Sequence, residues 1–393
     1  MKLPENVKYI INKLRAAGHR ADIVGGCVRD FLRGVLPSDY DITTDATPEE
    51  MEEVFRDERV IKTGIKHGTL TVIIGGEPYE VTTYRVDGNY TDNRHPDSVT
   101  FTKELSGDLS RRDFTVNAIA YNDIDGYTDV FGGLRDIENK IIRAVGDPVV
   151  RFSEDALRIL RALRFSATLG FKIEEETAKA IHTEKGRLKN VSAERVFTEW
   201  KKLIGGIYAY ELISEYPDVI GDILGIEGEI KLPKKEDFLS ADANIREMSI
   251  FAMNSGEAAK ERFLSSMARL KADNKRRDFG EDVLENLGTR CENFLGITLL
   301  LIKSSPEVAE GVISLSELVT GKKTKAKEIL QNLLQNGVCY RIGQLKIDGN
   351  DLKSLGISGR KIGEILNRLL LDIAYGKVKN EREALIKFVT ESV

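Results

Sequence analysis

Two aspartates one residue apart, Asp39 and Asp41, have the residue type and spacing of a metal site. They stand in Asp39-Tyr40-Asp41-Ile42, a segment that we expect to form a strand. Residues two apart on a strand face the same side, with Cα atoms roughly 6.6 Å apart, so both carboxylates would converge on one point. Such hard oxygen ligands suit Mg²⁺, which takes one or two carboxylates and adds phosphate oxygens and water. A polar turn before the next helix is the alternative for an isolated pair.

A glycine pair upstream favours the metal interpretation. Gly25 and Gly26 separate the apolar run ADIV (21–24) from the helical stretch CVRDFL (27–32). Glycine lets the backbone approach phosphate oxygens closely and leaves amide N–H groups to bind them. By itself the pair would indicate only a turn. Together with Arg29 one helical turn later and the two aspartates, it predicts a site for a triphosphate and two metal ions.

The elements that must position these residues change character along the chain. Up to about residue 150 the pattern mixes strands and helices: ADIV is a short strand, and TLTVIIGGEPYEVTTYR (69–85) is a hairpin. Thr47-Pro48-Glu49-Glu50 has the form of a capping box and predicts a helix start directly after the aspartates. From Asp155 onward, helical spacing of apolar residues replaces the alternation. Seams between parts of the chain are expected near Gly205-Gly206, around 231–238 and at 320–327, where charge or glycine interrupts the periodicity.

Bulk properties narrow the class of protein. A chain of 393 residues exceeds one ordinary core, so we expect about two to four domains. The net charge of −5 gives no overall basic signal, so any nucleic-acid surface must be local. The N-terminus lacks the apolar core of a signal peptide, and the longest apolar run, FLGITLLLI (294–302), is too short to span a membrane. Three cysteines without CxxC spacing fit a reducing cytoplasm.

Four segments, in order and spacing, resemble a known family. They are GGCVRDFLRGVLPSDYDI (25–42), RRDFTVNAIAY (111–121), DVFGGLRDIENKIIRAVGDP (129–148) and RFSEDALRILRALRF (151–165). The chain is similar in these motifs to the class II tRNA nucleotidyltransferases of the polymerase-beta-like superfamily, which comprise CCA-adding enzymes and bacterial poly(A) polymerases. The C-terminal segment 349–380 resembles the tail of these enzymes more loosely.

The resemblance implies an α+β fold in which a mixed-sheet nucleotidyltransferase head precedes helical neck, body and tail domains. We place these domains at 1–145, 146–205, 206–320 and 321–393. By motif position, Asp39 and Asp41 match the family's metal ligands, which bind Mg²⁺. The resemblance also implies that the substrates are CTP, ATP and the acceptor end of tRNA. The nucleotide-binding positions are Gly25, Gly26, Arg29, Arg112, Asp155, Arg158, Arg161 and Arg164.

The same residues can be interpreted from chemistry. Asp155 and Arg158 are three residues apart and would share a helix face. A carboxylate can accept from the exocyclic amino group of C or A while a guanidinium donates to the ring nitrogen. U and G present the reverse pattern, so this pair would select C and A without a template. Glu80 is a candidate third catalytic carboxylate, with a solvated strand residue as the alternative.

The polar segment Val86–Lys103 predicts a loop that ends in a short strand, SVTFT (98–102). CC-adding relatives have a shortened loop here, whereas CCA-adding and A-adding relatives keep a full one, so the loop is a candidate switch from C to A.

Local basic clusters could track tRNA phosphates, although each could also be a solvated helix face. They comprise Arg269, Lys271, Lys275, Arg276 and Arg277; Lys322, Lys323, Lys325 and Lys327; and Lys346, Lys353, Arg360 and Lys361.

The function that the resemblance implies is addition of C, C and A to the 3′ end of tRNA from CTP and ATP, without a template, by two-metal nucleotidyl transfer. Three alternatives to it remain open from the sequence: an A-adding enzyme, a bacterial poly(A) polymerase, and a catalytically inactive RNA-binding protein. Oligomeric state is not predicted.

Overall fold

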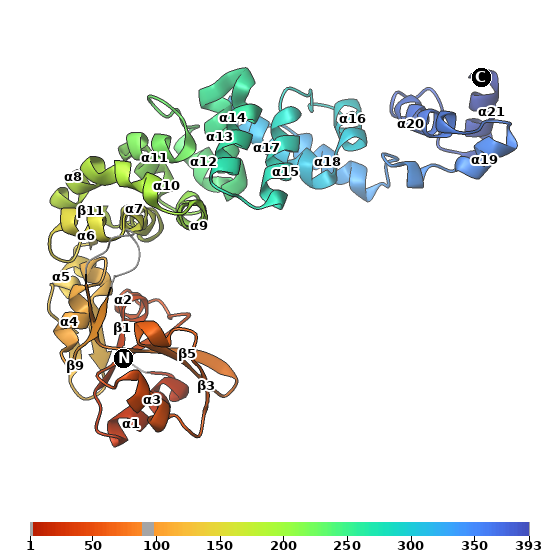
Figure 1. Ribbon diagram of the computed structural model, residues 1–393. Helices are drawn as coiled ribbons and strands as arrows, with labels where there is room; N and C mark the ends of the chain where they lie inside the picture. The colour runs from red at the N-terminus through yellow and green to blue at the C-terminus, as the bar shows by residue number, and fades with distance from the viewer. Residues whose placement is uncertain (1–2, 89–97, 393) are drawn as a thin grey trace. The chain divides into compact units, whose positions relative to one another are not determined.

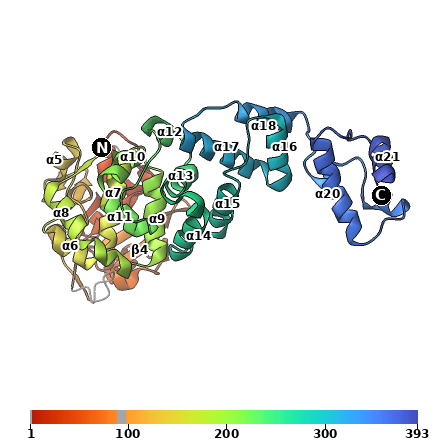
Figure 2. The same cartoon turned by 90° about the horizontal axis from the view of Figure 1, so that it is seen from above.

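A computed structural model describes residues 3–88 and 98–392. The chain divides into two compact units, Met1–Ile223 and Leu224–Val393. Figure 1 shows the strands of the main sheet in the red to orange part of the ribbon, while the green to blue part is helical, and Figure 2 shows the same division from above. The predicted fold class, an N-terminal mixed sheet followed by a helical region, is confirmed. The division into four domains stays a prediction.

In the described part of the chain, a seven-stranded mixed sheet organises the first unit. Strands β2 and β5 run parallel, and the other neighbouring pairs are antiparallel. The predicted hairpin is confirmed, because β4 and β5 pair across a turn at Gly75-Gly76 where both glycines have positive φ. In spatial order the strands are β3 (Arg59–Ile61), β4 (Thr69–Ile74), β5 (Glu77–Thr83), β2 (Asp41–Thr44), β1 (Ala21–Val24), β8 (Ile119–Asn122) and β9 (Gly126–Asp129).

The two faces of this sheet carry different residues. Ile23, Ile42 and Val81 point to one face and pack in a core with α1 (Glu5–Ala16) and α3 (Pro48–Val54). The other face carries Val24, which packs with α4 (Leu105–Ser110). Asp41 flanks Ile42 on β2 and therefore lies on this second face. The alternation of the strand thus keeps the Asp41 carboxylate out of the main core.

Helix α3 begins where its sequence predicts. The Thr47 side chain accepts from the Glu50 amide at 3.3 Å, and the Glu50 carboxylate accepts from the Thr47 amide at 2.8 Å. Pro48 is the first helical residue. A capping residue of this kind stabilises a helix by about 1 kcal/mol. The cap fixes the chain directly after the aspartate strand.

Beyond the sheet the first unit is mainly helical, with two small strand pairs. The ribbon β6 (Arg85–Asp87) with β7 (Val99–Phe101) is antiparallel, and β7 confirms the predicted short strand. The parallel pair β10 (Ile141–Ile142) with β11 (Lys172–Ile173) places a short strand where only helix was expected. The helices are α2 (Gly26–Leu32), α5 (Gly133–Glu138), α6 (Pro148–Glu154), α7 (Leu157–Leu169), α8 (Glu175–Glu184), α9 (Ala193–Ile204), α10 (Ala209–Glu215) and α11 (Pro217–Leu224).

The described residues of the second unit form helices without β-strands. At 320–327, where a seam is predicted, one helix ends at Thr320 and the next begins at Ala326. Among the described residues, no helix has the length and apolar character needed to cross a membrane. The helices are α12 (Lys235–Ser240), α13 (Ala243–Ser255), α14 (Ala259–Arg269), α15 (Asn274–Glu285), α16 (Phe294–Lys303), α17 (Pro306–Thr320), α18 (Ala326–Gln335), α19 (Gly349–Ser354), α20 (Arg360–Ala374) and α21 (Arg382–Ser392).

Candidate active site

The aspartate strand is shorter than the sequence predicts. Strand β2 begins at Asp41, so Asp39 precedes it and is exposed. The neighbouring strand β1 pairs with β2 only as far as Val24, opposite Asp41, and then the chain turns at Gly25. On that side no strand residue extends the pairing towards Asp39. The prediction that strand geometry sets the spacing of the two carboxylates is therefore wrong.

The carboxylates still interact electrostatically. Burial raises the pKa of the Asp41 carboxyl, the charge of Arg112 lowers it, and the charges of Asp39 and Glu80 raise it again. The parallel register pairs Ile42 of β2 with Val81 of β5, which places Asp41 and Glu80 one residue earlier on adjacent strands. Such a concentration of negative charge fits a hard divalent cation.

Within residues 3–88 and 98–392, no group of three or more His, Cys, Asp or Glu side chains is arranged to hold a metal ion. A site at Asp39 and Asp41 would therefore rest on two carboxylates, with its other positions left to phosphate oxygens and water, as Mg²⁺ favours. The catalytic role of Glu80 stays a prediction.

The glycine turn lies beside Asp41 and Arg112. Gly25 has φ +83°, and a Cβ there would lie 3.1 Å from Nη1 of Arg112 and 3.9 Å from Oδ2 of Asp41. The backbone angle therefore requires glycine, and a Cβ would also press on the Arg112 guanidinium. A Cβ on Gly26 would lie 3.6 Å from Nη2 of Arg29. The structure thus gathers five predicted residues around this turn.

Two side chains that the sequence did not single out connect this turn with helix α7. Asn117 accepts from Nη1 of Arg29 at 2.7 Å and donates to Asp113 at 3.0 Å. Asp113 accepts from Nε of Arg161 at 2.7 Å. Burial alone would raise the pKa of Asp113, but the charge of Arg161 and the hydrogen bonds from Asn117 and Arg161 lower it to about 2. The sequence feature that could have indicated them is the segment RRDFTVN, in which Asp113 directly follows Arg112 and Asn117 is the last residue.

Arg158 is buried and held by three partners. Its Nη2 donates to the carbonyl of Arg111 at 2.9 Å, and its Nη1 donates to the carbonyl of Arg151 at 3.1 Å and to Glu154. A guanidinium has five N–H groups. Within the described residues, Nε of Arg158 has no partner, so this edge of the side chain is available to a ligand.

Asp155 does not share a helix face with Arg158, so that prediction is wrong. Asp155 is the residue after α6, with φ −143° and ψ 102°, and α7 begins at Leu157. Its carboxylate accepts from the Leu157 amide at 3.0 Å and from Nη2 of Arg195 at 2.7 Å. The chain leaves helical geometry at Asp155, so helical spacing does not apply there. Its role in base reading stays a prediction.

Three guanidinium groups surround the ring of Phe165, which is 4% exposed. The guanidinium carbon of Arg164 lies 3.7 Å from the ring centroid, that of Arg29 5.0 Å and that of Arg161 5.4 Å. Glu199 of α9 accepts from Nε of Arg164 at 2.8 Å. The sequence prediction included these arginines but not the ring or the carboxylate that position them.

A cationic pocket of about 420 Å³ adjoins this cluster. Its lining comes from α2 and the residues that follow it, from α7, and from α9 with the glycine after it. Five of the lining side chains are cations and one is an acid, so the pocket suits an anion. The lining residues are Arg29, Asp30, Arg33, Val35, Arg164, Phe165, Thr168, Leu169, Lys201, Lys202 and Gly205.

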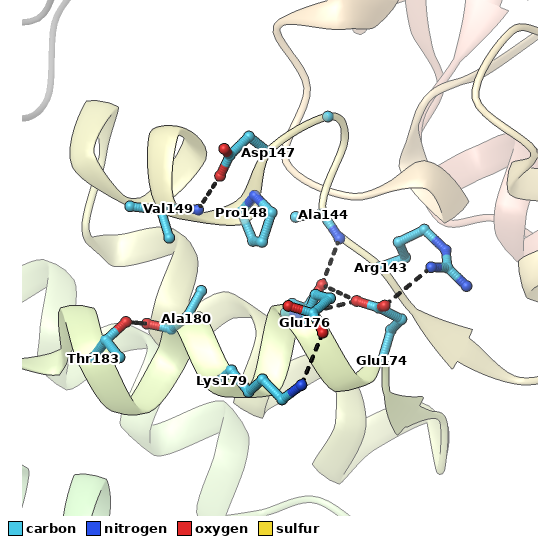
Figure 3. Close-up of a pocket in the computed structure, with 12 residues that line it drawn as sticks. Arg143, Ala144, Asp147, Pro148, Val149, Glu174, Glu176, Lys179, Ala180 and Thr183 are labelled. Atoms are coloured by element: carbon cyan, nitrogen blue, oxygen red, sulfur yellow. Dashed lines mark hydrogen bonds and ion pairs between the residues drawn. The ribbon is translucent and has the colours of Figure 1, made fainter.

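Another pocket, of about 580 Å³, lies between the segment 143–149 and helix α8 (Figure 3). It contains none of the predicted site residues. Its charged groups are already paired, since Arg143 contacts Glu174 at 3.2 Å and Lys179 contacts Glu176 at 2.8 Å. We therefore assign the site to the glycine turn and helix α7.

Three family models match parts of the chain. The family model described as Poly A polymerase head domain matches residues 21–143. A model for an RNA and SrmB binding site of polymerase A matches residues 170–215, and one for tRNA nucleotidyltransferase domain 2 matches residues 247–389.

Similar proteins cover nearly the whole chain. A CCA-adding enzyme of Ligilactobacillus salivarius is 35% identical over 96% of this chain and 94% of its own length. One of Leuconostoc mesenteroides is 35% identical over 98% and 95%. The crystal structure of the Bacillus stearothermophilus CCA-adding enzyme in complex with CTP has a TM-score of 0.80 and 31% identity, covering 100% of this chain and 98% of that one.

Proposed function

The chain belongs to the CCA-adding enzymes, and from this premise we propose that it adds C, C and A in turn to the 3′ end of tRNA, with CTP and ATP as substrates and no template. The observation that carries the proposal is the similarity over nearly the full length, together with Asp39, Asp41 and the segment RRDFTVN at one site. The reaction is attack of the RNA 3′-hydroxyl on the α-phosphorus of the nucleotide, with pyrophosphate leaving. It needs in-line positioning and neutralisation of charge.

Residues at the glycine turn provide the positioning for the triphosphate. The absence of a Cβ at Gly25 leaves room for phosphate oxygens beside Arg112, whose Nη1 faces that space. Arg29 is fixed next to Gly26 by Asn117. We assign these groups to the triphosphate because Nη1 of Arg112 and Nη2 of Arg29 both lie beside this turn.

Divalent cations would be held by Asp39 and Asp41, and we propose Mg²⁺. When bound there, they supply activation of the attacking hydroxyl and stabilisation of the leaving pyrophosphate. The charge that Asp39 and Glu80 impose on Asp41 supports this assignment. We also propose a cytoplasmic location, because the three cysteines are free thiols.

We assign base selection to Asp155 and Arg158, which are held by separate partners. Arg195 leaves each Asp155 oxygen with capacity for a further hydrogen bond, so Asp155 can accept from the amino group of C or A. Nε of Arg158 can donate to the ring nitrogen. Because U and G offer a carbonyl and a ring N–H at these positions, they would leave both groups unsatisfied.

Incubation of the purified protein with tRNA that lacks its CCA end tests the proposal. With CTP alone two nucleotides should be added, and with CTP and ATP together three. Addition of A alone to tRNA ending in CC, with no use of CTP, would identify an A-adding enzyme, and long A tracts would identify a poly(A) polymerase.

Asp41→Ala should remove addition of both C and A and leave tRNA affinity nearly unchanged, because the metal pair serves chemistry rather than RNA binding. Product length on a sequencing gel and a filter-binding assay provide the two measurements. Turnover within tenfold of the parent protein would rule out the metal assignment of Asp41, and Asp39→Ala provides the same test for Asp39.

A further inference from the structure

Asp108, which no part of the proposed function uses, is a fully buried carboxylate beside the site. It lies on α4 with no exposed surface. Its Oδ1 accepts from Nε and Nη2 of Arg111 at 3.0 and 2.7 Å. Its Oδ2 accepts from Nη2 of Arg112 at 3.1 Å and from the hydroxyl of Thr43 at 3.4 Å. A carboxylate that buried is stable only with such partners.

These contacts connect Asp108 to the strand of the predicted metal ligand. Thr43 follows Asp41 by two residues on β2, so both side chains face the same side of the sheet. Burial would raise the pKa of Asp108, but the charges of Arg112 and Arg111 and their hydrogen bonds hold it below its usual range. Asp108 is therefore a fixed negative charge at the face of the sheet that carries Asp41.

Arg112 stands between these two carboxylates. Within the described residues its guanidinium has one polar partner, Asp108, and its Nε is buried without a partner. Its Nη1 points at the glycine turn, where Oδ2 of Asp41 also lies, and its charge acts on Asp41. No ion pair joins Arg112 to Asp41 in the part of the chain that the structure describes. Within the described residues, the bond to Asp108 is the polar contact that opposes a rotation of the Arg112 guanidinium towards Asp41.

We propose that Asp108 is a positioning residue that holds Arg112 at the glycine turn and away from Asp41, and so keeps Asp41 open to a divalent cation. An Arg112–Asp41 ion pair would occupy a carboxylate oxygen and place a positive charge where the cation must bind. The inference rests on the proposed function, because it takes Asp39 and Asp41 as the metal-binding pair.

The test is Mn²⁺ binding to the full-length protein without nucleotide, measured from the electron paramagnetic resonance signal of free Mn²⁺. Asp108→Asn should weaken Mn²⁺ binding about tenfold, since one added charge at a few ångströms changes a site by at least this factor. The double variant Asp108→Asn with Arg112→Gln should return to within about threefold of the parent protein, because no guanidinium is left to compete.

Three further variants distinguish an effect of Asp108 on Arg112 from the loss of any buried carboxylate and from the loss of the metal site. Asp372→Asn removes another buried carboxylate, 3% exposed and paired with Lys377 at 2.9 Å, and should lower thermal stability without changing Mn²⁺ binding. Arg112→Gln alone should bind Mn²⁺ as tightly as the parent protein or more tightly, which keeps the proposal testable if Asp108→Asn does not fold. Asp41→Asn changes a proposed metal ligand, so its Mn²⁺ binding tests whether the metal site exists.

The outcomes are distinct. The proposal is overturned if folded Asp108→Asn binds Mn²⁺ like the parent protein, if the double variant stays as weak as Asp108→Asn, or if Arg112→Gln weakens binding. Unchanged Mn²⁺ binding by Asp41→Asn would instead remove the metal site of the proposed function. Loss of binding in Asp41→Asn, with full binding in Asp108→Asn, would reject this inference alone.

Discussion

Single residues in the site are fixed mainly by carboxylates and carbonyls that hold arginines. Asp113 holds Arg161 at 2.7 Å, and Glu199 holds Arg164 at 2.8 Å. A guanidinium has few rotamers left once one edge is bound, so its other edge is presented in a fixed direction. Arrangements of this kind favour planar ligands and phosphates, which match the geometry of the free edge.

Replacement of Arg158 tests base selection at this scale. Arg158→Ala should lower discrimination against UTP and GTP more than it lowers tRNA affinity, because the proposed role of its Nε is a contact with the base rather than with the RNA body. By analogy with contacts to base edges in DNA, the loss should be roughly 1 to 3 kcal/mol of discrimination. Ratios of kcat/KM for the four nucleotides measure it. Full preference for C and A in the variant would move base reading to other residues.

The Asp113–Arg161 bond predicts a pH dependence of stability. The pKa of Asp113 is lowered in the folded protein to about 2. Its contribution is therefore complete above the ordinary aspartate pKa of about 4, and is lost as pH falls from about 4 towards 2. Asp113→Asn should cost about 2 kcal/mol at pH 7 and less at pH 3. Urea unfolding at both values provides the measurement, and an equal cost at both would exclude a role for the charge.

The sequence predicted the residue types of the site better than their contacts. Asp41, Arg112 and the glycine turn were predicted to meet, and they do. Asp155 and Arg158 were not predicted correctly as a helical pair, because one extended residue separates two helices there. Asp113 and Asn117 were missed, because the role of a carboxylate in the site depends on which arginine the fold brings close to it.

At the scale of elements, local signals were reliable where a few neighbouring residues decide the structure. The cap of α3 involves Thr47 and Glu50 alone and was predicted in full. The start of β2 depends instead on where its partner β1 turns away, at Gly25, which lies far from Asp39 in the sequence. Strand ends set by a distant partner could therefore not be predicted from local pattern.

The ribbon of β6 and β7 permits a defined test of the loop that joins them. The loop residues 89–97 lie outside the described residues, but the Gly88 amide donates to the Ser98 carbonyl at 2.9 Å, so its two ends are adjacent. A two-residue Asn-Gly turn can close such a ribbon. Replacement of residues 89–97 by Asn-Gly should give a protein that adds two cytidines and omits the adenosine.

Product length with CTP and ATP both present is the readout for this variant. A second variant that keeps nine residues, all glycine or serine, separates the effect of loop length from that of loop sequence. A full three-nucleotide product from the Asn-Gly variant would show that the loop does not control the change from C to A.

At the scale of the whole molecule, a chain of net charge −5 must bind a polyanion through local surfaces. The predicted basic clusters differ in how exposed their side chains are and in whether these side chains form ion pairs. The side chain of Arg276 is 11% exposed and pairs with Glu247 at 2.8 Å, and Lys323 pairs with Asp237 at 3.0 Å. Lys322, Lys325 and Lys327 are exposed. Lys322, Lys325 and Lys327 are therefore candidates for contact with tRNA phosphates, whereas the Arg276 side chain is engaged by Glu247.

Removal of the charges in this segment tests that assignment. Serine at 322, 325 and 327 should weaken tRNA binding at low salt and reduce the slope of log Kd against log salt by up to about 2 to 3, since each phosphate contact contributes roughly 0.7 to 0.9. The KM for CTP on a saturating short RNA should not change, because the nucleotide site lies in the first unit. A matched control removes three exposed cations from that unit: Arg56, Arg59 and Lys62. An equal change in slope for both variants would show that only net charge matters, and no change for the first would exclude this segment from the tRNA surface.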